Sequence, residues 1–271
     1  MSETAGGETS PASYFTAMTD AFSRVLAERR FDPAVVGGLC ALAFDSFERT
    51  AAAQAEGAAP LACKGECAAC CGLRVVVTAP EAFLLARFVT ANREALLSRG
   101  VDAMRWIDDA DAATRGLSQS GRMALDRACA LLHEGLCIAY RLRPLACRGH
   151  ASYDRAACEA AARGEDVETA VSGPHVVVRG IIQNALMHSL RKAGLRFGLY
   201  ELHGGVADCV GAAAGAVGLA GRGGPIVGGD GGRVRRGRSG APVRFRHVGW
   251  LTSRTHASRF AKHAPLPGRF Q

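Results

Sequence analysis

The stretch "CKGECAACCGL" (residues 63–73) places four cysteines within nine residues, in the pattern C-x3-C-x2-C-C. Thiolates are soft ligands that suit zinc, copper(I) and iron–sulfur clusters. Such a site needs about four ligands, and short spacings let one loop or helical turn direct two thiols at one centre. We therefore expect the chain to fold around a metal centre to which this stretch contributes.

The cysteines of this stretch are not equivalent. Cys63 and Cys67 would share one face if the stretch is helical, because residues four apart are neighbours on a helix. Cys67 and Cys70 form a C-x2-C pair. The adjacent side chains of Cys70 and Cys71 are expected to point apart. One of these two thiols would then serve a second metal or stay outside the ligand set.

A second, irregular segment carries four more cysteines: Cys129, Cys137, Cys147 and Cys158. Pro144 suits the first turn of a helix, so Cys147 would lie near the N-terminal end of that helix, where the dipole favours a thiolate. Arg143 and Arg148 add positive charge close by. A zinc ion held by four thiolates is negatively charged, and these arginines would offset that charge and donate hydrogen bonds to sulfur.

Other residues have simpler interpretations. His133 and His150 could replace cysteines as ligands, but a place in a loop or beside the ligands is favoured. Tyr140 is expected to pack rather than to react. Cys40 lies on an apolar helical stripe and is expected in the core, whereas Cys209 is interpreted as incidental. An acidic run is most simply a solvated helix face: Asp108, Asp109 and Asp111.

Two cysteine motifs, or boxes, together resemble those of a known family. The first box is the C-x3-C-x2-C-C stretch described above. The first box is followed by C-x2-Y-x2-R-P-x2-C-R, here "CIAYRLRPLACR" (residues 137–148). This pair resembles the YkgJ-type cysteine-cluster family, described as zinc- or iron-chelating domains, over roughly residues 60–165. The subsequent "GHASYDRAACE", with Ser152 and Cys158, is similar to a variant of the family. The resemblance implies metal binding without specifying the metal.

The predicted cofactor is zinc or iron, the latter as an ion or as a [4Fe–4S] cluster. Eight thiols exceed the need of one zinc ion, and they fit either one such cluster with spare thiols or two zinc ions. The resemblance matches seven of the eight thiols to cysteine positions of the family, and it matches the eighth, Cys158, to a position of the variant. The predicted ligands are Cys63, Cys67, Cys70, Cys71, Cys129, Cys137, Cys147 and Cys158.

Apolar periodicity predicts a mainly α fold with at most a short β element. Residues 73–77 form an apolar run that could be a strand. Thr78 and Glu81 form a capping box that should start a helix running to about Arg99. Further helices are expected elsewhere in the chain. One carries an apolar stripe at residues 15–25, and the next begins at Asp32-Pro33. Two more cover residues 102–117 and 121–127, and the last runs through Val178, Ile182, Leu186 and Leu190 to near His203.

The expected organisation is a disordered N-terminus (1–11), one helical metal-binding domain (12–203) and a disordered Gly/Arg-rich tail (204–271). The tail holds 11 Lys and Arg against 2 Asp and Glu, whereas the rest of the chain has 22 against 23. The net charge of +8 thus belongs to the tail, and nucleic acid is expected as a partner only there. Its composition also resembles out-of-frame translation of a GC-rich gene, which raises the hypothesis of a frameshift product.

The N-terminal residues show neither a basic start nor an apolar segment, and no stretch approaches the roughly 20 apolar residues of a membrane span. A cytoplasmic protein with reduced thiols and no membrane contact is therefore expected. In that compartment, clustered cysteines indicate metal or redox chemistry more than structural disulfides.

Three classes of function agree with these patterns. The main interpretation is a metal-binding protein whose centre is structural or serves metal handling or sensing, because no catalytic constellation accompanies the cysteines. One alternative is an iron–sulfur-dependent enzyme similar to flagellin lysine N-methylases, which carry a related cysteine cluster. The second alternative is a thiol–disulfide redox protein. The metal ion is the predicted partner; the patterns specify no protein partner, substrate or reaction.

Overall fold

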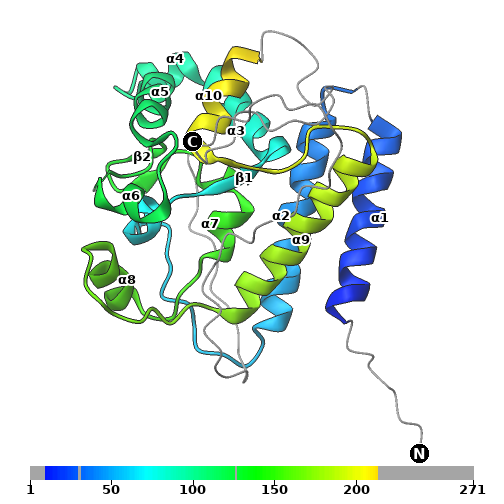
Figure 1. Ribbon diagram of the computed structural model, residues 1–271, viewed down its shortest axis with the longest axis horizontal. Coiled ribbons are helices and arrows are strands. Elements are labelled where there is room, and N and C mark those ends of the chain that lie inside the picture. The colour runs from blue at the N-terminus through cyan, green and yellow to red at the C-terminus, as the bar shows by residue number, and fades with distance from the viewer. Residues whose placement is uncertain (1–9, 30–31, 126, 213–271) are drawn as a thin grey trace, which may run out of the picture.

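The computed structural model describes residues 10–29, 32–125 and 127–212, and these are mostly helical (Figure 1). Two short antiparallel strand pairs join the helices: β1 (Val76–Thr78) with β4 (Leu199–Glu201), and β2 (Leu132–His133) with β3 (Leu136–Cys137). The expectation of a mainly α fold with a small β element is confirmed. The helices are α1 (Pro11–Arg29), α2 (Val35–Gln54), α3 (Ala79–Ala91), α4 (Arg93–Leu97), α5 (Ala103–Thr114), α6 (Gln119–Ala124), α7 (Leu145–Gly149), α8 (Arg155–Ala162), α9 (Gly173–Lys192) and α10 (Leu202–Ala212).

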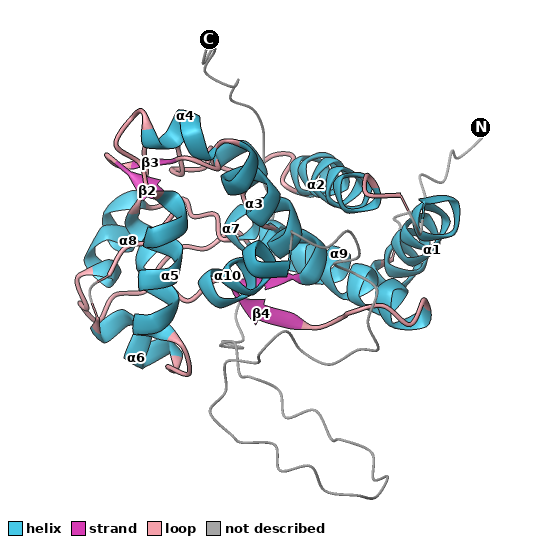
Figure 2. Ribbon diagram, turned by 90° about the horizontal axis from the view of Figure 1, so that it is seen from above, coloured by secondary structure: helices cyan, strands magenta, loops and turns pink. Residues whose placement is uncertain are grey.

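Helices α1, α2 and α9 lie side by side and form one flank of the molecule (Figures 1 and 2). Their apolar stripes face one another, because residues spaced by three and four share a helix face. A buried polar contact adds to this packing: the Ser189 hydroxyl donates to the Thr19 carbonyl oxygen over 3.0 Å. The apolar stripe of α2, which includes the predicted core residue Cys40, and the predicted stripe of α9 are buried: Val36, Leu39, Cys40, Ala43, Phe44, Phe47, Val178, Ile182, Leu186 and Leu190.

Helix α3 begins at the predicted capping box. The Glu81 carboxylate accepts hydrogen bonds from the backbone N–H of Thr78 (2.7 Å) and from its hydroxyl (2.8 Å). It also accepts the backbone N–H of Leu145 (2.7 Å), which fixes the start of α7 against α3. The predicted single helix to residue 99 is wrong: it breaks at Asn92, whose side-chain amide donates to the Phe88 carbonyl oxygen and so competes with the helical bonds.

The predicted helix ending near His203 is also wrong. Helix α9 ends at Lys192, and glycines at positive φ follow at Gly194 (φ 68°) and Gly198 (φ 122°). Glycine adopts this conformation without the steric cost that a Cβ would impose, so the chain can reverse here. It then forms β4, which pairs with β1 in the register Val77 opposite Tyr200.

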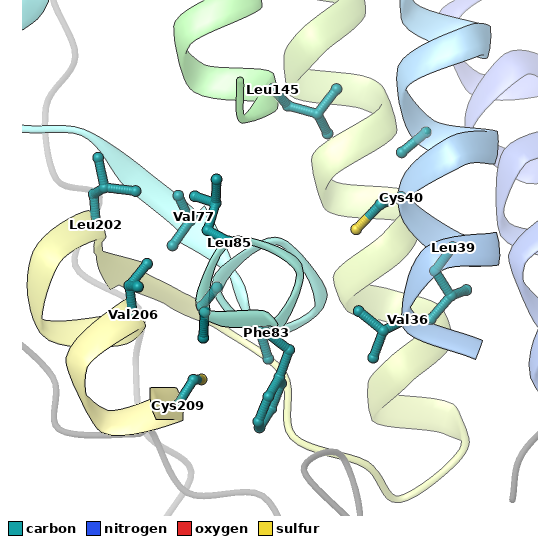
Figure 3. Close-up of a cluster of buried hydrophobic side chains, with 14 of the residues drawn as sticks. Val36, Leu39, Cys40, Val77, Phe83, Leu85, Leu145, Leu202, Val206 and Cys209 are labelled. Carbon is teal, nitrogen blue, oxygen red and sulfur yellow. The ribbon is translucent and has the colours of Figure 1, made fainter. Parts of the chain in front are cut away.

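The predicted domain boundary at residue 203 falls inside α10. Leu202, Val206 and Cys209 are 2%, 1% and 0% exposed, and Figure 3 shows them facing residues of α3 and β1. A Cβ at Gly205 would lie 3.2 Å from the Cβ of Tyr200, so this glycine permits the close approach. Cys209 is thus a core residue rather than an incidental one. The remaining expectations for residues 1–9 and 213–271 lie outside the described residues.

Within the described ranges, none of the helices combines the length and the apolarity that crossing a bilayer requires. The largest helices, α2 and α9, each have 20 residues but carry polar and charged side chains on their outer faces. Helices α5, α6 and α8 lie on the opposite flank from α1, with the β2–β3 hairpin beside them (Figure 2). The predicted cysteine ligands lie on this side of the fold or next to it.

Candidate metal centre

The first cysteine stretch is built of turns rather than of an α-helix. The Cys67 N–H donates to the Lys64 carbonyl oxygen over 3.0 Å, and the Cys71 N–H donates to that of Ala68 over 2.9 Å. The 3₁₀ helix η1 (Ala69–Gly72) then carries Cys70 and Cys71. The expected sharing of one helix face by Cys63 and Cys67 therefore does not apply. Tight turns bring these cysteines together instead.

The adjacent thiols of Cys70 and Cys71 do not point apart as expected. Their side chains lie within hydrogen-bond reach of each other, and this contact, followed by burial, raises the pKa of the Cys70 thiol. The 3₁₀ turn explains the difference, because successive side chains are rotated by a smaller angle around its axis than along an extended chain, where they point to opposite sides. Cys71 is therefore a near neighbour of whatever Cys70 binds.

A hairpin positions the next two cysteines. Glu134 (φ 48°) and Gly135 (φ 78°) form its two-residue turn, a conformation that fits a tight hairpin. Leu132 of β2 pairs with Cys137 of β3, and Cys129 lies just before β2. The Cys129 N–H donates to the Cys71 carbonyl oxygen over 2.8 Å. The backbone itself thus joins the second segment to the first.

The last two cysteines lie on short helices. Cys147 is in α7, which begins after Pro144 as predicted. Cys158 is in α8, which packs against η1 and is capped by Asp154, whose carboxylate accepts the Ala157 N–H over 2.9 Å. Between these helices, the Ser152 N–H donates to the sulfur of Cys63 over 3.2 Å. Ala62 in turn donates to the Ser152 carbonyl oxygen over 2.9 Å, a second backbone tie between the segments.

The thiols form two neighbouring sets that meet at Cys70. The inner set consists of Cys70, Cys129, Cys137 and Cys147, and its members interact electrostatically with one another. The outer set consists of Cys63, Cys67 and Cys158. Cys67 and Cys158 both raise the pKa of Cys63, and so does Cys70 of the inner set. The structure therefore brings cysteines that are up to 95 residues apart in sequence into one region.

Burial disfavours thiolates throughout the inner set. It raises the pKa of Cys129 and of Cys137 to about 11, and neighbouring thiols contribute to the increase. The pKa of Cys147 also lies well above its ordinary value, for the same reasons. The expectation that a helix N-terminus favours the thiolate of Cys147 is therefore wrong for the metal-free protein. Helix α7 has only 5 residues, and its dipole does not offset the loss of solvent.

The donor set fits a soft, positively charged metal. It is rich in sulfur and, apart from the exposed Cys63, partly buried, and a bound cation would replace the thiol protons and neutralise the resulting thiolates. In the described part of the chain, however, no three Cys, His, Asp or Glu side chains already converge on one metal position. All ten cysteines carry free thiols. The fold thus gathers the predicted ligands without fixing which of them coordinate.

Comparison with known proteins identifies this region. Residues 62–166 match the CxxCxxCC family model, described as a "putative zinc- or iron-chelating domain". The resemblance to this cysteine-cluster family is confirmed. No curated protein and no solved structure matches the chain. The cysteine-cluster domain includes both cysteine segments, the hairpin and helices α3 to α8.

Arg143 lies against the inner set of the cysteine-cluster domain. Its guanidinium carbon is 3.9 Å from the centre of the Tyr140 ring, a cation–π contact. Its charge acts on Cys70, Cys137 and Cys147 and opposes the effect of burial on their pKa values. Its Nε is buried without a hydrogen-bond partner among the described residues. A buried donor beside thiols is suited to stabilise thiolates, as predicted for Arg143.

Tyr140 and Arg148 support the loops of the domain. A Cβ at Gly65 would lie 3.7 Å from the Tyr140 ring, so Tyr140 packs against the first cysteine stretch, in agreement with its predicted packing role. Arg148 was expected to donate to sulfur. It donates instead to the carboxylate of Glu48 (2.5 Å) and to the carbonyl oxygens of Arg143 (2.7 Å) and Arg141 (2.6 Å). Arg148 therefore joins the second segment to α2.

The two histidines lie at the edges of the domain. The ring of His133 is 5.6 Å from that of Trp106, which places it against α5. His150 follows α7, and burial together with the charge of Arg179 lowers its pKa. A neutral imidazole is available as a metal ligand, but neither ring belongs to a group of metal-holding geometry within the described ranges.

One of the three aspartates predicted on a solvated helix face is buried. Asp111 is 9% exposed and forms an ion pair with Arg115, which also approaches Asp208 of α10 at 3.4 Å. The packing of α10 over α5 covers this position, which explains the difference. Asp108 and Asp109 are exposed, as expected.

The sequence patterns did not indicate two further groups beside the cysteines. Arg122 of α6 is 1% exposed and lies close to Cys129. A buried pair forms between His203 and Glu201, with Nδ1 and Oε1 3.0 Å apart, and His203 Nε2 accepts the Ala130 N–H over 3.2 Å. Only the docking of β4 and α10 brings the latter pair to the hairpin, so no local pattern could have shown it.

Proposed function

We propose that this protein binds zinc or iron through its clustered cysteines and that the centre joins two distant segments of the chain. The observation that carries the proposal is the meeting of the inner and outer sets of thiols at Cys70. The family match supports metal chelation as the activity. The proposed ligands are the eight predicted ones: Cys63, Cys67, Cys70, Cys71, Cys129, Cys137, Cys147 and Cys158.

The inner set is the best candidate for the primary ligands. Its four thiols come from η1, the β2–β3 hairpin and α7, and each lies within electrostatic range of the others. Four thiolates complete a tetrahedral zinc site or hold one [4Fe–4S] cluster. The outer set then belongs to a second metal ion or provides spare thiols, with Cys71 available to either set.

The residues around the inner set have distinct roles in this proposal. Arg143 offsets negative charge on the thiolates. Tyr140 and Arg148 hold the loops in place. The bound metal supplies positive charge that lets buried thiolates persist and, in an iron–sulfur cluster, a redox centre. Because the ligands come from both segments, binding free energy contributes to folding.

Anaerobic purification of the full-length chain, followed by elemental analysis and a visible absorption spectrum, tests the proposal. Stoichiometric zinc in colourless protein supports a structural centre. Iron with acid-labile sulfide and a brown colour supports a cluster. Protein that is folded, fully reduced and free of both metals would refute the proposal.

The same preparation separates the remaining classes of function. An S-adenosylmethionine-dependent rise in the melting temperature would favour the methylase-like enzyme, and its absence would count against that class. Reversible disulfides in metal-free protein that keeps its structure would favour the redox class. A metal-dependent fold without either property leaves metal binding as the function.

A further inference from the structure

The junction between β4 and α10 contacts both cysteine segments through hydrogen bonds. The Leu202 N–H donates to the carbonyl oxygen of Val75 over 2.9 Å, just beyond the first cysteine stretch. The ring of His203 reaches the second segment, where its Nε2 accepts the Ala130 N–H over 3.2 Å. Two consecutive residues thus hold both segments, although they lie outside the part of the chain that matches the family.

The bond from Ala130 bears directly on the position of Cys129. Ala130 follows Cys129 in the chain and is 8% exposed, and its buried N–H needs an acceptor. The N–H of Cys129 itself donates to the Cys71 carbonyl oxygen over 2.8 Å. Two successive backbone N–H groups are therefore fixed, one by the first cysteine stretch and the other by His203. Together they restrict where the sulfur of Cys129 can lie.

Glu201 fixes the orientation of the His203 ring. Its Oε2 accepts the backbone N–H groups of His203 (2.7 Å) and Gly204 (3.0 Å), which places the carboxylate at the start of α10. Its Oε1 lies 3.0 Å from His203 Nδ1, and both side chains are buried. Because Nε2 accepts a hydrogen bond, the proton of the neutral ring is on Nδ1, beside this carboxylate. The carboxylate thus favours the ring form whose Nε2 can accept from Ala130.

We propose that His203 is a positioning residue of the metal centre, which acts through the Ala130 N–H to hold Cys129 in the inner set. This inference rests on the proposed function. Without His203 the Ala130 N–H would be buried and unpaired, so the backbone before β2 would shift towards water and carry Cys129 with it. The centre would then depend on a residue outside the family-matched domain.

The experiment compares full-length wild type with three substitutions of His203. The amide of His203→Gln lies near the place of Nε2 and can accept from Ala130. The amide of His203→Asn lies near the place of Nδ1 and reaches only Glu201, whereas His203→Leu makes neither contact. Ser189→Ala is the matched control, because the buried Ser189 hydroxyl joins α9 to the Thr19 carbonyl oxygen of α1 over 3.0 Å, away from the cysteines.

Two measurements separate positioning from a general loss of stability. The first is the rate at which iodoacetamide labels Cys129 relative to Cys158, followed by peptide mass spectrometry on the reduced protein as isolated, below the melting temperature of each variant. The second is the zinc affinity, obtained by anaerobic competition with a chromogenic chelator. A general loss of stability lowers the melting temperature but leaves the labelling ratio and the zinc affinity unchanged, as expected for Ser189→Ala.

The Leu and Asn variants are expected to raise the labelling ratio about 3- to 10-fold, as for the loss of one buried hydrogen bond. Their zinc affinity should fall about 10-fold, the lower end of the range for groups that support metal ligands, because His203 acts one residue away from Cys129. The Gln variant should stay near wild type in both measurements.

A wild-type labelling ratio or a wild-type zinc affinity in His203→Leu would overturn the inference. If that variant does not fold, equal labelling ratios of the Asn and Gln variants would overturn it. A wild type that carries no iron and takes up no zinc would refute the proposed function, and the labelling ratios would still decide whether His203 positions Cys129.

Discussion

Cys147 and Cys40 show how the same side chain acquires different roles in different surroundings. Cys147 lies among three other thiols of the inner set, and these neighbours, together with burial, raise its pKa. Cys40 lies on the apolar face of α2, 1% exposed, as predicted for a core residue, and its pKa is shifted by burial, Glu81 and Arg148 rather than by the predicted ligands. The first position suits a metal ligand, whereas the second suits a small apolar core residue.

Replacing Cys147 with serine is expected to remove metal and lower the melting temperature together, because the binding free energy contributes to folding. Cys40→Ser is the matched control. A buried hydroxyl without a partner costs about 1–3 kcal/mol, so this variant should lose stability but keep its metal. Elemental analysis and thermal melts of the same samples measure both effects. Full metal occupancy in Cys147→Ser would contradict its assignment as a ligand.

Glu201 makes the stability of the fold depend on pH. Burial acts to raise the pKa of this carboxyl, but the side chain of His203 and the backbone N–H groups of His203 and Gly204 outweigh it, and the pKa is lowered. A lowered folded-state pKa contributes stability above the unfolded value, near 4.5, and this stability is lost as the pH falls through the folded value.

Glu201→Gln is therefore expected to be less stable than wild type at pH 7, and the gap should narrow as the pH falls below about 4.5. Urea unfolding of both proteins at a series of pH values measures the gap, with metal content recorded for each sample. A gap that is constant with pH would show that the charge of Glu201 makes no contribution.

Helix α10 shows how an element can depend on tertiary contacts. Its sequence, "LHGGVADCVGA", has weak helical periodicity and two adjacent glycines, so composition alone assigned most of it to the tail. In the fold, Gly205 allows close packing against Tyr200 and Ala82, and Val206 and Cys209 fill the space over α3 (Figure 3). By contrast, the long apolar stripes of α2 and α9 were sufficient to predict those helices.

A chain that ends at residue 203 is expected to be much less stable than one that ends at residue 212. The shorter chain lacks Val206 and Cys209, and burial of one such side chain contributes about 1.5–3 kcal/mol. Thermal melts of the two truncated proteins, both with metal supplied, provide the comparison. Equal melting temperatures would mean that α10 is dispensable for the fold.

Across the whole molecule, the sequence could indicate which cysteines are candidate ligands, and that set stays a prediction, but it could not indicate their arrangement. The spacings of the cysteines and the Arg143-Pro144 pair indicate metal binding locally. Which thiols face each other depends on the Glu134–Gly135 turn, on the docking of α7 through Glu81 and on the tie between Cys129 and Cys71. These contacts span tens of residues, so no local pattern contains them. The same holds for the burial of Arg122.

Removal of the metal is expected to lower the melting temperature of the whole protein, because the centre joins the first cysteine stretch to residues 129–158. Differential scanning calorimetry before and after anaerobic treatment with a strong chelator measures the change. Readdition of the metal should restore the transition. An unchanged melt, with disulfides that form reversibly on oxidation, would instead support the thiol–disulfide class.

X-ray absorption spectroscopy at the metal edge of the anaerobically purified full-length protein tests the central claim most directly. Sulfur scatterers should dominate the first shell, at about 2.3 Å for zinc or iron with thiolates, and the metal-edge signal itself should be largely lost in Cys147→Ser, which is expected to lose metal. A first shell made mainly of nitrogen and oxygen, or one unchanged by that substitution, would contradict a centre held by the clustered cysteines.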